Sequence, residues 1–164
     1  MTKFDIAMGN CKKVRVDGNI ETFEECPGEQ FGFHKDTGSK KWTVTHIRSG
    51  LAIDDKGESL KKAKDNLKKV LSDPEKVRII QQTPDLEEVL KQARYRKKKY
   101  ERFSELKLKF MDITGIDLPR SSWTGGVDVV RLDTILQTPD GISLADYIKQ
   151  KYGEDAYKIV AELI

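Results

Sequence analysis

The chain has 164 residues, of which 37% are hydrophobic and 35% charged, and its formal net charge is +3 at pH 7. This length suits one domain with or without a subdomain and is sufficient for a buried core. Its two cysteines, Cys11 and Cys26, are too few for a disulfide framework or a four-ligand zinc site. Without a signal peptide or a run of roughly 20 apolar residues, we expect a cytoplasmic protein with no membrane partner.

Residues 1–30 give the weakest pattern. Short apolar patches occur near both ends of this region, and the alternation over residues 12–16 suits a half-buried strand. Asp17-Gly18-Asn19 is typical of a turn. We therefore assign no further element before residue 31, within an N-terminal part that is β-rich as a whole.

A β-hairpin is predicted next, from residues 31–36 and 41–47 joined by a turn in which Gly38 takes a positive φ. Pairing Lys35 with Trp42 and Phe33 with Val44 gathers the aromatic residues on one face, whereas a shift of one residue scatters them. We therefore predict this register.

Residues 51–53 can add a third antiparallel strand before a loop at residues 54–57. The spacing of apolar residues then predicts a helix over residues 58–71 that covers the sheet. The N-terminal part, residues 1–72, is thus expected to contain a β-β-β-α core at residues 31–72.

Two helix start signals follow, Asp73-Pro74 and Thr83-Pro84-Asp85. The second opens a long helix, predicted over residues 84–111. Its apolar stripe is interrupted at Arg96 and Lys97, and burying an unpaired cation is costly. We therefore expect the middle of this helix to leave the core or to meet an anionic partner.

Charge is concentrated in the same helix. Residues 91–109 contain nine Lys or Arg and two Glu, a net charge of +7, which leaves −4 for the other residues. The asymmetry predicts a basic surface on a mildly acidic body. The high charged fraction favours an elongated shape, a protruding helix or an oligomer.

Beyond the long helix, an irregular connection around Trp123 precedes residues 127–132, which suit either a strand or the start of a short helix. Two further helical patterns end the chain, and we expect them to pack against the proximal part of the long helix. Residues 73–164 then form a mainly helical part. The predicted fold class is α+β, a small antiparallel three-stranded sheet with a covering helix, followed by a long basic helix and a C-terminal helical subdomain.

No motif indicates catalysis. His34 and His46 fall on opposite faces of the predicted hairpin, so they cannot serve one substrate as acid and base. We interpret His46 as a residue at the edge of the core and His34 as a surface residue. Neither cysteine has a base beside it, Gly125-Gly126 is not a phosphate-binding loop, and the scattered carboxylates lack metal-site spacing. We predict a non-enzymatic protein without cofactor or metal.

The basic run is the feature that implies a partner. Clustered Lys and Arg neutralise phosphates, and interleaved tyrosines can stack on bases. The predicted residues for binding nucleic acid or another partner are Lys91, Arg94, Tyr95, Arg96, Lys97, Lys98, Lys99, Tyr100 and Arg102. Secondary candidates on the sheet and in the irregular connection are His34, Arg48, Arg120 and Trp123.

Our first functional hypothesis is a binding protein that contacts nucleic acid through the basic helix. The alternative is a protein-binding inhibitor or adaptor, for example a phage-encoded antagonist of a host nucleic-acid-handling or defence complex. It would use the same helix or the Trp123 loop. A second alternative is an enzyme of unknown class. Part of the charge also suits an ordinary helix surface, because Lys97 and Glu101 have i,i+4 spacing.

Overall fold

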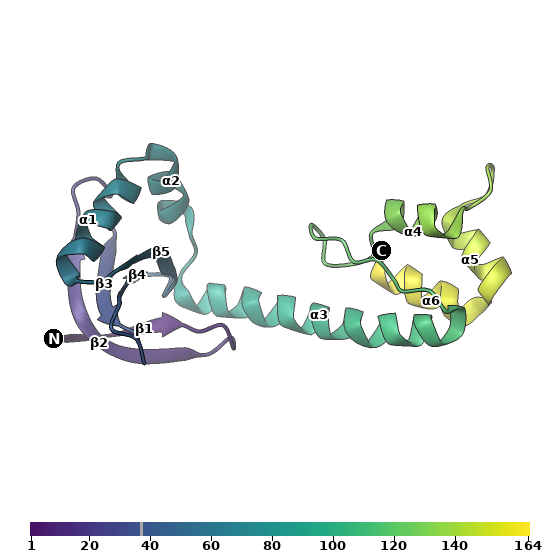
Figure 1. Cartoon of the computed structure of the whole chain (residues 1–164), viewed down its shortest axis with the longest axis horizontal. Coiled ribbons are helices and arrows are strands. Elements are labelled where there is room, and N and C mark those ends of the chain that lie inside the picture. The colour runs from purple at the N-terminus through teal and green to yellow at the C-terminus, as the bar shows by residue number, and fades with distance from the viewer. Residues whose placement is uncertain (37) are drawn as a thin grey trace. The chain divides into compact units, whose positions relative to one another are not determined.

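The computed structural model describes residues 1–36 and 38–164, and its fold is α+β, as predicted (Figure 1). Five strands form one antiparallel sheet in the order β1-β2-β3-β4-β5. The strands are β1 (Thr2–Ala7), β2 (Lys13–Thr22), β3 (Gln30–Lys35), β4 (Trp42–His46) and β5 (Ala52–Gly57). The helices are α1 (Leu60–Leu71), α2 (Pro74–Gln82), α3 (Leu86–Thr114), α4 (Val129–Leu136), α5 (Leu144–Tyr152) and α6 (Glu154–Leu163). In this described part of the chain, no helix has the length and apolar character needed to cross a membrane.

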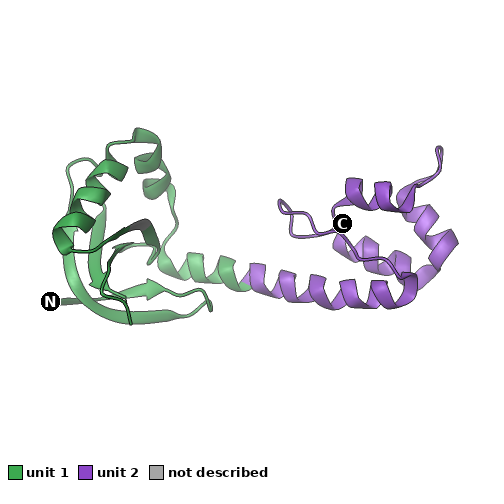
Figure 2. Cartoon of the chain, viewed as in Figure 1, with its two compact units in different colours: residues 1–94 green, residues 95–164 purple. Residues whose placement is uncertain are grey.

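The chain divides into two compact units, unit 1 at residues 1–94 and unit 2 at residues 95–164 (Figure 2). The division falls within α3, whereas we expected it after residue 72.

The later division has a physical cause, because α2 and the first turns of α3 pack with the sheet. Val77 and Ile80 of α2 contact the core of unit 1, and Leu90 of α3 is buried. The Leu86 amide donates a hydrogen bond to the Arg48 carbonyl at 2.9 Å. Helix α2 and the first turns of α3 therefore belong to the sheet unit.

The sheet is larger than the three strands predicted, because β1 and β2 add a hairpin to it. These two strands bury only Phe4 and Gly18, so they carry little of the apolar alternation that marks a strand. Gly18 lies inside β2 and not in a turn. A Cβ atom there would collide with the Phe33 carbonyl oxygen, so glycine permits a close approach of the two backbones.

The predicted hairpin register is confirmed, since Lys35 pairs with Trp42 and Phe33 with Val44. Gly38 has a φ of 82°, as expected for the turn, while Thr37 lies outside the described residues. The predicted loop at residues 54–57 is wrong, because β5 continues through it to Gly57.

The core of unit 1 lies between the aromatic face of this hairpin and α1. The Ser59 side chain caps α1 and the Asp73 side chain caps α2, in the second case ahead of the predicted proline. The buried side chains are Phe23, Cys26, Phe31, Phe33, Val44, Ala63, Leu67 and Leu71.

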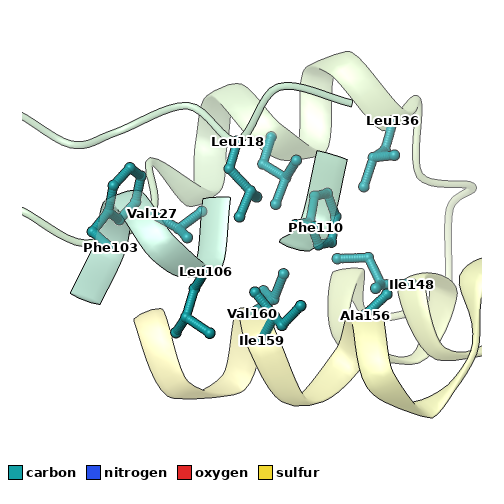
Figure 3. Close-up of a cluster of buried hydrophobic side chains, with 11 residues drawn as sticks. Phe103, Leu106, Phe110, Leu118, Val127, Leu136, Ile148, Ala156, Ile159 and Val160 are labelled. Carbon is teal, nitrogen blue, oxygen red and sulfur yellow. The ribbon is translucent and has the colours of Figure 1, made fainter. Parts of the chain in front are cut away.

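Unit 2 folds around the second half of α3 (Figure 3). Its core joins three residues of α3, Phe103, Leu106 and Phe110, to side chains of α4, α5, α6 and the α3–α4 connection. The C-terminal helices therefore pack on the distal part of α3, and the proximal packing that we expected is wrong. Of the two structures predicted for residues 127–132, the start of a short helix is confirmed. The Asp128 side chain caps α4 by accepting a hydrogen bond from the Arg131 amide at 3.1 Å.

Replacing Phe110 with Ala should unfold unit 2 selectively. The side chain is 0% exposed, and removing a buried Phe costs about 3–5 kcal/mol. We expect faster hydrogen exchange across α4–α6 with unchanged protection of β3 and β4. The matched control is Met111→Ala, the next residue of α3, which is 47% exposed and should leave exchange unaltered. Equal loss of protection in both units would contradict the division.

Candidate nucleic-acid interface

The middle of α3 is exposed on all sides. From Lys91 to Arg102 every residue is exposed except the half-buried Ala93, and burial resumes at Phe103. The interrupted apolar stripe predicted this, because the segment offers no side chain that either core could bury without desolvating a cation. We call residues 95–102, which lie in unit 2, the basic segment.

Several cations of this helix are already engaged. Arg102 donates to both carboxylate oxygens of Glu162 at 2.6 and 3.0 Å and to Glu105 at 3.0 Å. These bonds raise the pKa of Arg102 and hold the pKa of Glu162 below its usual value, so both groups stay charged. Through its bonds to Glu162, Arg102 joins α3 to α6. Two lysines are also near carboxylates: Lys97 lies 3.9 Å from Glu101, and Lys91 lies 3.6 Å from Glu88.

Three predicted cations, Arg94, Arg96 and Lys98, make no ion pair or side-chain hydrogen bond with any residue whose side chain the structure describes. Beside them, Tyr95 is 68% exposed. Because no described carboxylate competes for these cations, they are the ones available to an external anion.

One side of the basic segment lines a groove of about 440 Å³ in unit 2. Tyr95, Lys98, Lys99 and Arg102 have the i, i+3, i+4, i+7 spacing of a single helix face. The facing wall comes from residues 124–126 and 162–164. We call these four residues the groove face.

The charged side chains that line this groove are three cations and Glu162, which leaves a net +2. Lys99 donates to the Thr124 carbonyl at 2.8 Å, and that bond leaves its charge uncancelled. The groove is thus electropositive at Lys98 and Lys99, where a polyanion would bind most favourably.

The two predicted tyrosines differ. The Arg120 guanidinium lies 4.3 Å from the centroid of the Tyr100 ring and 5.9 Å from that of Phe103, so one face of Tyr100 is occupied by a cation–π contact. No such contact is found for Tyr95 in the described chain. Arg120 therefore fixes the α3–α4 connection on α3, and Tyr95 is the better placed of the two for stacking.

His34 is buried, so its interpretation as a surface residue is wrong. It is 3% exposed, its Nε2 lies 3.1 Å from the Thr45 hydroxyl, and its ring packs edge-on against Phe4 with centroids 5.7 Å apart. The cause is β1, which places Phe4 over this face of the sheet. His34 is thus unavailable to an external ligand.

Arg48 is occupied inside unit 1. Its guanidinium donates to Glu29 at 2.7 and 3.2 Å and to the carbonyls of Gln81 and Thr83 at 3.0 and 2.5 Å. The side chain therefore satisfies carbonyl groups at the C-terminal end of α2, where a cation is favoured. It holds α2 against the sheet and is not a free binding residue.

Glu29, His46 and Ser49 form a chain of hydrogen bonds that the sequence did not reveal. His46 Nε2 lies 2.7 Å from the Glu29 carboxylate, and Nδ1 lies 2.9 Å from the Ser49 hydroxyl. The residue types are those of a serine nucleophile with its base, but Ser49 is 0% exposed and no substrate can reach it. His46 is a satisfied residue at the edge of the core, as predicted.

No three His, Cys, Asp or Glu residues in the described part of the chain are grouped as metal ligands. Cys26 is fully buried, and burial raises the pKa of its thiol, which disfavours the reactive thiolate. Among the predicted binding residues, the groove face is the set that the structure brings together beside a groove.

Comparison with protein-family models, with curated proteins and with solved structures found no match to the chain.

Replacing Glu29 with Gln should destabilise unit 1, because Arg48 and His46 lose their charged acceptor. Hydrogen bonds to charged groups are worth about 1.5–3 kcal/mol, and we expect a loss of this size in the free energy of unfolding. Native-state hydrogen exchange of β3 and β4 measures it. Glu25→Gln removes an exposed carboxylate from the same unit and should be neutral.

The stabilisation by Glu29 should also depend on pH. Chiefly the hydrogen bond from Arg48, and then that from His46, lower the pKa of Glu29 below its ordinary 4.5. A lowered pKa means that the folded state favours the carboxylate, so the contribution is complete above the ordinary pKa and is lost as the pH falls through the folded value. The stability difference between the wild type and Glu29→Gln should therefore shrink in acid, and a constant difference would contradict this role.

Proposed function

We propose that the chain is a non-enzymatic nucleic-acid-binding protein that contacts the phosphate backbone through the groove face of α3. The observation that carries the proposal is the exposed Lys98, which has no partner among the described residues and lies beside Tyr95 and Lys99 on an electropositive groove. Cations in such a row neutralise phosphates and release condensed counterions, which favours binding.

The groove face is a better candidate than the whole circumference of the helix. Successive residues turn by about 100°, so Arg96 and Lys98 point about 200° apart and cannot meet the same stretch of backbone directly. Lys98 shares its side with Tyr95, Arg102 and the wall formed by residues 124–126. Nucleic acid is therefore expected to bind on the groove side of α3 and not equally around the whole helix.

Charge reversal tests this direction. Lys98→Glu should weaken binding to nucleic acid at low salt and reduce the slope of log Kobs against log[salt] by about 1, as for one lost phosphate contact. Fluorescence anisotropy of labelled oligonucleotides over a salt series measures both quantities. Arg96→Glu makes the same charge change on the other side of the helix and should have a smaller effect.

Lys62→Glu, at an exposed position of α1 in unit 1, is the control for net charge alone. Equal effects of all three substitutions would indicate non-directional attraction and contradict a contact through the groove face. No detectable binding of the unaltered protein to single-stranded or duplex DNA or RNA at low ionic strength would refute the proposal itself.

Protein binding is the second candidate, and a specific surface favours it. On α3, Leu108 and Met111 are 64% and 47% exposed and lie one turn apart. Leu108 borders a groove of about 280 Å³ that is also lined by Tyr100, Phe103, Ser104, Lys107 and Arg120. Exposed apolar side chains beside a groove are typical of helix-mediated protein contacts.

Affinity purification with and without nuclease separates the two candidates. A stoichiometric protein partner that survives nuclease treatment and is lost in Leu108→Lys would support an inhibitor or adaptor. Association that disappears with nuclease would support nucleic-acid binding.

A further inference from the structure

We propose that Trp123 stacks on a nucleobase and that the groove face accordingly prefers single-stranded nucleic acid. This inference rests on the nucleic-acid binding proposed above and names the form of the ligand. The Trp123 side chain is 96% exposed, although indole is among the largest apolar groups in proteins.

The exposed indole stands on an ordered turn. The amides of Trp123 and Thr124 both donate to the Ser121 hydroxyl, at 3.3 and 3.2 Å. The Gly125 amide donates to the Ser121 carbonyl at 3.1 Å, and the Ser121 amide to the Gly126 carbonyl at 2.9 Å. The backbone around Trp123 is therefore bonded within the turn, which restrains the main chain that carries the indole and lowers the entropy cost of ordering it on binding.

The turn is attached to the groove face. Lys99 donates to the carbonyl of Thr124, the residue after Trp123, and Thr124 itself lines the groove. On the other side of the turn, the Val127 amide donates to the Leu163 carbonyl at 3.1 Å. Figure 1 shows this connection projecting beyond the start of α4. Trp123 is thus the residue next to one wall of a groove whose cations without a carboxylate partner among the described residues are Lys98 and Lys99.

An exposed aromatic side chain beside a row of cations matches the two parts of single-stranded nucleic acid, its bases and its phosphates. Phosphates of the strand meet the cations, and an unpaired base offers its face to the indole. In a duplex both faces of each base are already stacked, so the indole would have to separate neighbouring base pairs at a cost. The positive charge of the rim favours this polyanion over a neutral or basic protein surface.

Intrinsic fluorescence tests the stacking directly. The chain has two tryptophans, so a Trp42→Phe background leaves Trp123 as the reporter. The full-length variant is titrated at low salt with oligo(dT) and with the oligo(dA)·oligo(dT) duplex of equal length. We expect quenching of Trp123 emission by oligo(dT) and tighter binding of the single strand than of the duplex.

Substitution separates stacking from charge. Trp123→Ala should weaken oligo(dT) binding about tenfold, within the range known for base–aromatic stacking, and leave the salt slope unchanged because no charge is lost. Trp123→Phe should restore part of the affinity. Because the side chain is exposed, neither variant should alter the fold, and circular dichroism checks this.

The possible outcomes are distinct. Salt-dependent binding with unchanged Trp123 emission, or a preference for the duplex, would overturn the stacking inference and leave phosphate binding by the groove face standing. Failure to bind either oligonucleotide would overturn the stacking inference, and failure to bind RNA as well would remove both proposals. A protein partner that survives nuclease but is lost in Trp123→Ala would assign the turn to protein recognition and overturn the inference.

Discussion

The cost of desolvating cations determines where the two apolar cores of this chain end along α3. Between Ala93 and Phe103, α3 contains no apolar side chain other than two tyrosines, so neither core can extend over this stretch. The core of unit 1 ends with the first turns of α3, where Leu90 is buried, and that of unit 2 begins at Phe103. The same composition that separates the units leaves a run of Lys and Arg facing water.

Cations of the same type have different roles in the two units. Arg48 and Arg102 each hold a carboxylate with both oxygens and connect elements that are distant in sequence, the first α2 with the sheet and the second α3 with α6. Fork-like guanidinium geometry suits these contacts better than a lysine ammonium would. Lys98, an exposed ammonium without such a partner among the described residues, is suited instead to an external phosphate. The function that we propose depends on which charges the fold leaves unpaired.

Unit 2 brings together the parts of the proposed interface. Its apolar core fixes the second half of α3 against α6, and the cation–π contact between Arg120 and Tyr100 holds the α3–α4 connection on the same helix. Lys99 then binds the turn that carries Trp123. A row of cations and the turn that follows an exposed indole, separated by more than twenty residues of sequence, thereby line one groove.

Local and periodic features were predictable from the sequence: the α+β class, the register of β3 on β4, the capped start of α2 and the exposure of the basic segment. Each depends on neighbouring residues, or on alternation that one buried face requires. The additional strands β1 and β2, the burial of His34 beneath Phe4 and the assignment of Arg48 to α2 were not predictable. They depend on backbone pairing and on contacts between distant residues, which leave no local pattern. For the interface, the sequence by itself determined which residues are basic. Only the tertiary structure decided which of them are neutralised, because a carboxylate such as Glu162 reaches its cation through the fold.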